Sequence, residues 1–344
     1  MSVLDVDQLL SPISDESPSG DDLEYEPEFG ALERAAQGKA EQVMGDEVVA
    51  AEPPEWSEVF EQAQELLGRT KDLRIAVHLA RAAVNRKGVP GLADGLALIR
   101  GLLEHFWDTV HPVLDAEDDN DPTFRVNSVL PLSDKAGLLG DILVMPLVSS
   151  RAVGRFSLRD VRVAKGELHA LPDQENVPDA ALIHAAFMDV DLDTIQEDAQ
   201  AIDSALESAK QIDAIYIENV GGANSPELAG LLAELKMLKI VYAENLLARG
   251  VGVEMPEGEG AAGGGEPGAA AISGEVRSRE DAIRMIEKIC SYFERNEPSS
   301  PVPMLLQRVK RLIPMDFLEI MAELTPDAVA QAEAIGGIKH EDGY

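Results

Sequence analysis

The sequence predicts an all-α protein: a helical N-terminal domain, a helical middle region, a flexible Gly/Ala-rich linker and a small helical C-terminal domain. Three observations support this prediction. Aromatic residues make up only 4% of the 344 residues, so the core must be built from Leu, Ile, Val and Ala, which favours packed helices. Apolar residues recur at helical spacing over several long segments. A Gly-rich segment then separates a short tail from the rest of the chain.

Five segments before the linker have the apolar spacing of helices, and they span 56–67, 72–87, 91–112, about 192 onward, and 226–250. Asp72 is the expected N-cap of the second segment, which Gly88 and Pro90 end. The fifth is expected to begin at Ser225-Pro226, a cap followed by proline at the first helical position. Residues 155–163 alternate only weakly and predict a short strand or an extended loop.

The clearest boundary is the segment 251–274, in which 8 of 24 residues are Gly, 5 are Ala and none is basic. Such a composition buries too little apolar surface to order itself, so the segment is predicted to be a tether. The predicted organisation is therefore a domain over 1–165, an acidic helical region over 166–250, the linker, and a C-terminal domain over 275–344.

Charge excludes several classes of partner. Lys and Arg total 29 and Asp and Glu total 63, a net charge of −34, which repels nucleic acid and anionic lipid. No apolar run is long enough to cross a bilayer, the N-terminus lacks a signal-peptide pattern, and there is one cysteine. We therefore expect a cytoplasmic protein with no nucleic-acid partner and no direct membrane insertion.

The tail is the least repulsive part of the chain. Residues 275–344 hold 9 basic and 13 acidic residues, net −4, whereas the preceding residues hold 20 and 50, net −30. The tail is predicted to form three short amphipathic helices. A domain of this size is near the lower limit for independent stability, so self-association would stabilise it. The expected oligomerisation residues are Ile283, Ile286, Phe293, Leu305, Leu306, Val309, Leu312 and Phe317.

No motif predicts catalysis, a cofactor or a metal. The tract 115–121 resembles a calcium loop, but the required Gly is Asn120 and the bidentate Glu is Val126. It is better explained as a solvated loop in which Asp121 and Pro122 cap the next helix. The alternative is a metal-dependent enzyme that uses these carboxylates with His105 or His111. A Gly-x-Gly-x-x-Gly match at 258–263 lies inside the tether, without the strand and helix that the motif requires.

One basic cluster interrupts the acidic sequence, and it comprises Arg69, Lys71, Arg74, Arg81, Arg86 and Lys87. Two interpretations stand side by side. The cluster meets an acidic partner, with Arg69, Lys71 and Arg74 as the candidate binding residues, or it balances acidic neighbours within its own domain. Cys290 falls on the apolar side of a tail helix and is expected to be a small buried hydrophobe.

Three ordered stretches of the sequence resemble the TssA family of type VI secretion systems, which is built on an ImpA-type N-terminal domain. The first runs from Leu9-Leu10-Ser11-Pro12 through Pro18-Ser19-Gly20-Asp21-Asp22-Leu23-Glu24-Tyr25 to Glu52-Pro53-Pro54-Glu55-Trp56. The second includes Leu66-Leu67-Gly68-Arg69-Thr70-Lys71-Asp72-Leu73-Arg74, His105-Phe106-Trp107-Asp108-Thr109-Val110-His111-Pro112 and Arg125-Val126-Asn127. The third is in the tail, at Arg279-Glu280-Asp281-Ala282-Ile283-Arg284 and Glu297-Pro298-Ser299-Ser300-Pro301.

The resemblance implies a structural role and no enzymatic activity. TssA-like proteins act at the baseplate of a contractile injector, prime tube and sheath assembly, and contact baseplate, sheath and membrane-complex proteins. Their C-terminal domains form homo-oligomeric rings, and the apparatus is anchored in the inner membrane of Gram-negative bacteria. The tail here is shorter than the large C-terminal domain of some members, which favours a baseplate position. The alternative function is a monomeric acidic adaptor or chaperone for another secretion component.

Overall fold

The computed structural model describes residues 3–39, 42–44, 47–49, 52–115, 117, 120–170, 177–252, 283, 286, 289–290 and 302–313. The chain divides into two compact units, Met1–Ala261 and Ala262–Tyr344. The described residues are mostly helical, which confirms the predicted fold class.

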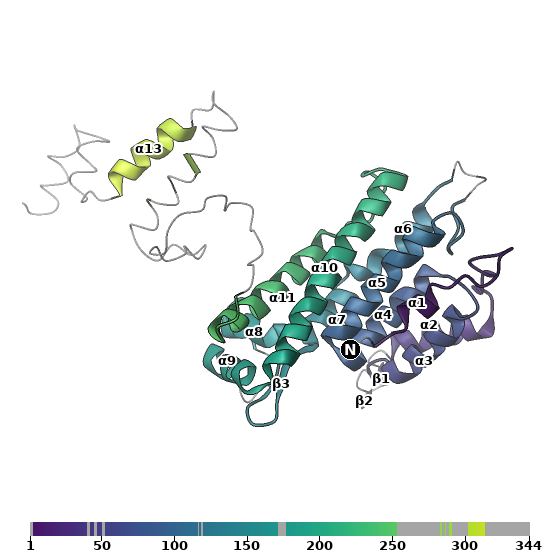
Figure 1. The fold of residues 1–344 in the computed structure, drawn as a ribbon, viewed down its shortest axis with the longest axis horizontal. Helices are drawn as coiled ribbons and strands as arrows, with labels where there is room; N and C mark the ends of the chain where they lie inside the picture. Colours follow the sequence, from purple (N-terminus) through teal and green to yellow (C-terminus); the bar gives the residue numbers. More distant parts are fainter. Residues whose placement is uncertain are drawn as a thin grey trace, which may run out of the picture. The chain divides into compact units, whose positions relative to one another are not determined.

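The first unit contains helices and two β-hairpins (Figure 1). The helices are α1 (Val6–Leu9), α2 (Pro27–Gln37), α3 (Trp56–Leu67), α4 (Leu73–Lys87), α5 (Val89–Phe106), α6 (Thr123–Val129), α7 (Leu138–Val144), α8 (Leu158–Ala164), α9 (Ala180–Asp189), α10 (Leu192–Val220) and α11 (Ala229–Ala248), with a 3-10 turn η1 at Leu130–Leu132. The strands β1 (Gln42–Met44) and β2 (Glu47–Val49) pair antiparallel, as do β3 (Pro146–Ser150) and β4 (Gly154–Ser157).

Helix α5 is the centre of this unit. It packs against α4 on one side and α10 on another, while α3 packs on α4 and α11 on α10 (Figure 1). Glycines allow the closest approach to α4: a Cβ on Gly91 would lie 2.1 Å from the carbonyl oxygen of Ala83, and one on Gly95 would lie 2.7 Å from the Cβ of Ala80. The sequence leaves open whether residues 166–250 pack on the preceding domain, and the α5–α10 contact shows that they do.

Helix boundaries agree with the sequence where local capping decides them. Helix α3 spans the predicted range, and α4 begins after Asp72, whose side chain accepts a hydrogen bond from the Arg74 backbone N–H. Helix α5 begins at Val89, two residues earlier than predicted, because Pro90 fits in a first turn. It ends at Phe106, short of the predicted Pro112.

Two local predictions need correction. Helix α11 begins at Ala229 and not at Pro226, and its Leu231 N–H is accepted by the distant Ser133 hydroxyl at 3.2 Å. The segment 155–163 is a strand only to Ser157; it then becomes α8, because Ser157 and Asp160 form a reciprocal capping box. The start of α11 depends on a tertiary contact with Ser133. The start of α8 depends on a local capping box, whose residues looked like weak alternation in the sequence.

The buried Tyr242 of α11 contacts both β3 and α10. The Tyr242 hydroxyl donates a hydrogen bond to the Leu147 carbonyl at 2.5 Å and lies 3.4 Å from an Asp198 carboxylate oxygen. Burial raises the pKa of Asp198 from 3.8 to about 6, against the opposing effect of Tyr242. Between these two pH values the unfolded chain has lost a proton that the folded chain keeps. Stability from this group therefore falls as pH rises through that window.

In the second unit, α13 (Val302–Leu312) is the longest described element, and Ile283, Ile286, Ile289 and Cys290 are also helical. Cys290 is buried, as expected, with its sulfur 3.8 Å from the Pro303 carbonyl oxygen. Phe293 and Phe317 lie outside the described residues, as do residues 253–282 of the predicted linker and tail. Over the part of the chain that is described, no helix is long and apolar enough to cross a membrane.

Candidate functional site

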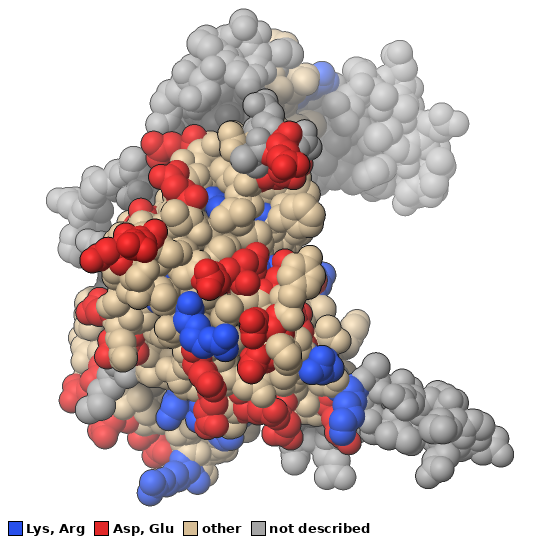
Figure 2. Space-filling model, turned by 90° about the vertical axis from the view of Figure 1, so that its right-hand side faces the viewer, with Lys and Arg blue, Asp and Glu red and all other residues tan. Residues whose placement is uncertain are grey.

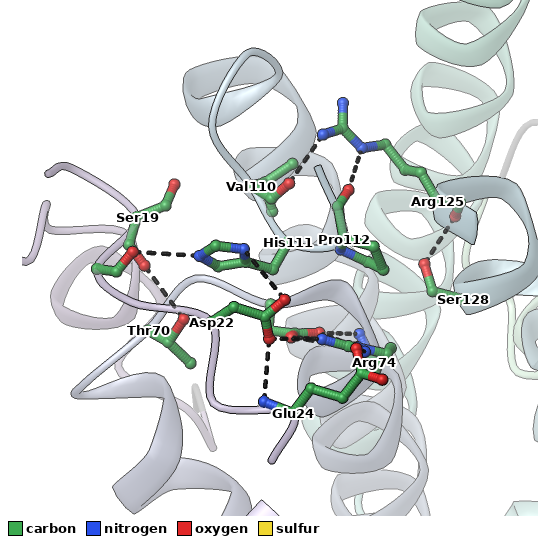
Figure 3. A network of polar contacts seen from close by, with 12 residues as sticks. Ser19, Asp22, Glu24, Thr70, Arg74, Val110, His111, Pro112, Arg125 and Ser128 are labelled. Carbon is green, nitrogen blue, oxygen red and sulfur yellow. Dashed lines mark hydrogen bonds and ion pairs between the residues drawn. The ribbon is translucent and has the colours of Figure 1, made fainter. Parts of the chain in front are cut away.

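A buried arginine fixes the loop that follows α5. Arg125 of α6 is 0% exposed, and its guanidinium donates to the carbonyl oxygens of Val110 at 2.8 Å and Pro112 at 2.9 Å (Figure 3). It also donates to the Trp107 carbonyl oxygen at 2.6 Å. Its guanidinium carbon lies 4.9 Å from the centre of the Trp107 ring. Burial lowers the pKa of Arg125, and the charge is met by three backbone dipoles.

The same loop is held from its other side by residues next to the start of α4. The backbone N–H of Leu73 donates to the His111 carbonyl at 2.9 Å, and that of His111 donates to the Lys71 carbonyl at 2.9 Å. The His111 ring nitrogen Nε2 is 3.2 Å from the Gly20 carbonyl oxygen. The N-terminal loop, the start of α4 and the loop after α5 are therefore joined by hydrogen bonds.

Arg74 is the centre of charge in this region. Its guanidinium contacts the carboxylates of Asp72 at 2.7 Å, Glu24 at 2.7 Å and Asp22 at 3.1 Å (Figure 3). Burial alone would lower the pKa of Arg74, but the hydrogen bonds and charges of Asp72 and the neighbouring carboxylates outweigh it and raise that pKa. The side chain is 18% exposed, so most of its donors are already engaged.

A pocket of about 590 Å³ opens above this network. Its walls come from the loop before α2, from α2 and α4, from the loop after α5, and from α6 and η1; they comprise Asp22, Glu24, Tyr25, Glu33, Arg74, Val77, His78, Pro112, Val113, Phe124, Asn127, Ser128 and Pro131. The Glu33 carboxylate accepts a hydrogen bond from the His78 ring nitrogen Nε2 at 3.0 Å, and this hydrogen bond lowers the pKa of Glu33 despite its partial burial. The pocket is thus acidic, with aromatic residues at its edge.

The basic cluster predicted from sequence is spread over several environments. Lys71 is 1% exposed and donates to the Leu9 and Leu67 carbonyls at 2.7 and 3.0 Å, so its expected role as a surface contact is corrected. Arg74 is occupied as described, and Arg69 lies 3.8 Å from Glu26 and is 45% exposed. The contacts of Lys71 and Arg74 favour the interpretation that the cluster balances its own domain, and Arg69 remains a predicted contact.

Two further members of the cluster, Arg81 and Arg86, also have partners within the unit. Arg81 contacts Asp141 at 2.7 Å, and the Arg86 guanidinium lies 4.3 Å from the centre of the Phe60 ring. Figure 2 shows acidic side chains spread over one face, with basic side chains set among them.

The calcium-like tract behaves as a helix cap where it is described. The Asp121 carboxylate accepts from the Thr123 backbone N–H at 2.8 Å and from its hydroxyl at 2.6 Å, at the start of α6. Asp115 in turn accepts from the Glu117 N–H at 2.9 Å. Among the residues with described positions, no group of three His, Cys, Asp or Glu side chains is arranged to hold a metal ion.

Comparison with known proteins assigns the chain. Residues 10–134 match the family model described as "ImpA, N-terminal, type VI secretion system". The chain is also 42% identical to the "Type VI secretion system component TssA1" of Pseudomonas aeruginosa, over 98% of this chain and 100% of that protein. The chain belongs to the TssA family. The resemblance found in the sequence is confirmed.

A solved TssA structure supports the fold as well. The N-terminal domain of the TssA component from Burkholderia cenocepacia, which includes the conserved ImpA region, matches with a TM-score of 0.57 and 26% identity. The match covers 72% of this chain and 96% of that domain. Every residue that lines the 590 Å³ pocket falls within the matched ImpA range of 10–134.

Sequence reasoning missed the pocket itself. Tyr25 and Arg125 belong to stretches that carry the TssA resemblance, but no spacing links them to Glu33, His78 or Phe124. Their proximity depends on how α2, α4 and α6 pack. For Tyr25 the sequence offered one signal, an aromatic residue between two glutamates in an aromatic-poor chain.

Proposed function

We propose that this TssA-family chain is a homo-oligomeric scaffold of the type VI secretion baseplate. Its C-terminal residues would associate in a ring and hold many N-terminal units around one axis. Membership of the TssA family indicates a structural component of a type VI secretion system. The proposal adds the ring, the baseplate position and the partners. The partners are baseplate, sheath, tube and membrane-complex proteins.

The observation that carries the proposal is the apolar face of α13. Met304, Leu305 and Val309 are 69%, 56% and 45% exposed in the second unit. An 11-residue helix is marginal by itself in water, so its stability depends on packing. Burying each such side chain contributes about 1.5–3 kcal/mol, and a ring repeats that contribution in every copy.

The charge distribution favours association through the same segment. Residues 275–344 carry a net charge of −4, whereas the residues before them carry −30. Repulsion between copies is therefore smallest at the tail. An array that forms there raises the effective concentration of each N-terminal unit at its partner, so individually weak contacts become sufficient.

The experiment is the native mass of the full chain and of a chain ending at Gly274, measured by light scattering. We expect a discrete oligomer that becomes a monomer on truncation. Leu305→Asp should dissociate the full-length oligomer, whereas Gln307→Asp, at an exposed position on the same helix, should leave its mass unchanged. A monomeric full chain would reject the scaffold and favour the monomeric acidic adaptor.

A further inference from the structure

We propose that the pocket between α2, α4 and α6 binds an arginine-bearing segment of a partner protein. The inference rests on the proposed function only in taking that partner to be another component of the secretion apparatus. It names a surface and a ligand chemistry that the scaffold model leaves open.

Large apolar side chains at the edge of the pocket are exposed to solvent. Tyr25 is 96% exposed, Phe124 is 69% exposed and Val113 is 51% exposed, and all three line the pocket. The whole chain has only 8 Phe, 5 Tyr and 2 Trp, so two exposed aromatic rings at one site are a concentrated feature. Clustered exposed apolar residues in a recess are typical of interaction sites.

The charge of the pocket selects a cation. Asp22, Glu24 and Glu33 are 42%, 46% and 38% exposed, so their carboxylates still face solvent. Against these three carboxylates the pocket holds one guanidinium, that of Arg74, so its Asp, Glu and Arg side chains sum to a net charge of −2. The surrounding N-terminal sequence adds a long-range field of the same sign, since residues 1–274 carry a net −30.

Arginine fits this combination better than lysine does. A guanidinium pairs with carboxylates through a planar set of donors and stacks on aromatic rings, and both kinds of group are present here. Arg74 already shows the pattern from inside the protein, because its guanidinium contacts Glu24 and lies 4.8 Å from the centre of the Phe29 ring. A volume of about 590 Å³ leaves room for neighbouring side chains of an extended segment.

The pocket is pre-formed. Arg125 fixes the carbonyls of Val110 and Pro112 (Figure 3). The His111 backbone is hydrogen-bonded to the Lys71 and Leu73 backbones. The loop that carries Pro112 and Val113 is therefore held on two sides before any ligand arrives. A site that is ordered in advance loses less conformational entropy on binding.

The test is site-specific photo-crosslinking in cells that assemble the secretion apparatus. The full chain carries a benzoylphenylalanine at Tyr25 or, in a second variant, at Phe124. The control carries it at Val144, which is 58% exposed on α7 and does not line the pocket. Crosslinked peptides are mapped by mass spectrometry. We expect both pocket positions to capture one common foreign peptide that contains an arginine, and Val144 not to capture it.

Charge variants make the result specific. Glu33→Gln removes one pocket carboxylate and should lower the crosslink yield at Tyr25 about 10-fold, the loss typical of one charged contact. Asp203→Asn on α10, outside the pocket, should leave the yield unchanged. Replacing the captured arginine by lysine should also lower it.

The proposal is overturned by no crosslink from either pocket position, by capture of a peptide without arginine, or by a crosslink yield insensitive to Glu33→Gln. Capture of residues 302–313 of this chain would also overturn it, since the occupant would then be a TssA tail. The native mass is measured on the same samples. A discrete oligomer with no pocket crosslink rejects the pocket alone, whereas a monomer with the expected crosslink rejects the ring alone.

Discussion

Removal of the Arg125 guanidinium is the perturbation whose cost the structure defines best. Arg125→Ala leaves the carbonyls of Trp107, Val110 and Pro112 without their donor in a site that is 0% exposed. Each buried carbonyl left unpaired costs roughly 1–3 kcal/mol, so three set a range of roughly 3–9 kcal/mol. Water entering the vacated space and the shared loop make these terms non-additive. We expect a loss of about 4 kcal/mol.

That loss is large beside the roughly 5–15 kcal/mol that stabilises a typical domain, and it corresponds to about 8–16 °C in melting temperature. The assay is urea unfolding of the full chain followed by tryptophan fluorescence. Both tryptophans, Trp56 and Trp107, lie in the first unit, so the signal reports on that unit alone. Trp107 also lies against the mutated side chain.

Two further variants show whether the hydrogen bonds are responsible. Arg125→Lys keeps the charge but presents its donors from one point, so it should recover part of the lost stability. Arg155→Ala, an exposed arginine on β4, should change the free energy of unfolding by less than about 0.5 kcal/mol. The reasoning is refuted if Arg125→Ala costs no more than Arg155→Ala, because the three carbonyls would then find other donors at no cost.

Two more predictions concern the helix packing. Asp198→Asn should reduce the fall in the free energy of unfolding between about pH 4 and pH 6. It should also stabilise the protein at neutral pH by up to about 3 kcal/mol, because it removes a carboxyl group whose pKa is raised by burial to about 6. Unfolding midpoints across that pH range test it against Asp203→Asn, which is 54% exposed, and equal slopes in the two variants would contradict it. Gly91→Ala should cost about 1–3 kcal/mol, since its Cβ would meet the Ala83 carbonyl oxygen at 2.1 Å. Thermal unfolding beside Gly222→Ala, where nothing lies within 4 Å, checks this, and equal melting temperatures would show that α4 and α5 separate without cost.

The helices that the sequence predicted well are those in which local chemistry is sufficient. Helix α4 has an N-cap, an apolar face and a glycine after its end, all within 17 residues of sequence, and its start at Leu73 follows from Asp72 alone. Family membership could also be predicted, because the stretches from Leu9 to Arg125 and in the tail can be recognised from the order of their residues, without knowledge of the fold.

Where a distant residue completes the local structure, the sequence was insufficient. The start of α11 depends on Ser133, which lies 98 positions from the Leu231 N–H that it accepts. The sequence likewise did not show which basic side chains are buried. Arg69 and Lys71 are two residues apart, yet Lys71 is 1% exposed and Arg69 is 45% exposed. The spacing of basic residues in the sequence does not show which of them is buried and which lies on the surface.

The sequence by itself determined the fold class, most of the long helices, the family and the strongly acidic character of this protein. Those properties depend on composition, apolar spacing and short motifs, each of which acts over a few residues. The tertiary structure alone decided the pocket, because Tyr25, Glu33, His78 and Phe124 come from elements separated by up to 99 positions in the chain. They meet only because α2, α4 and α6 pack around a loop that the buried Arg125 holds in place.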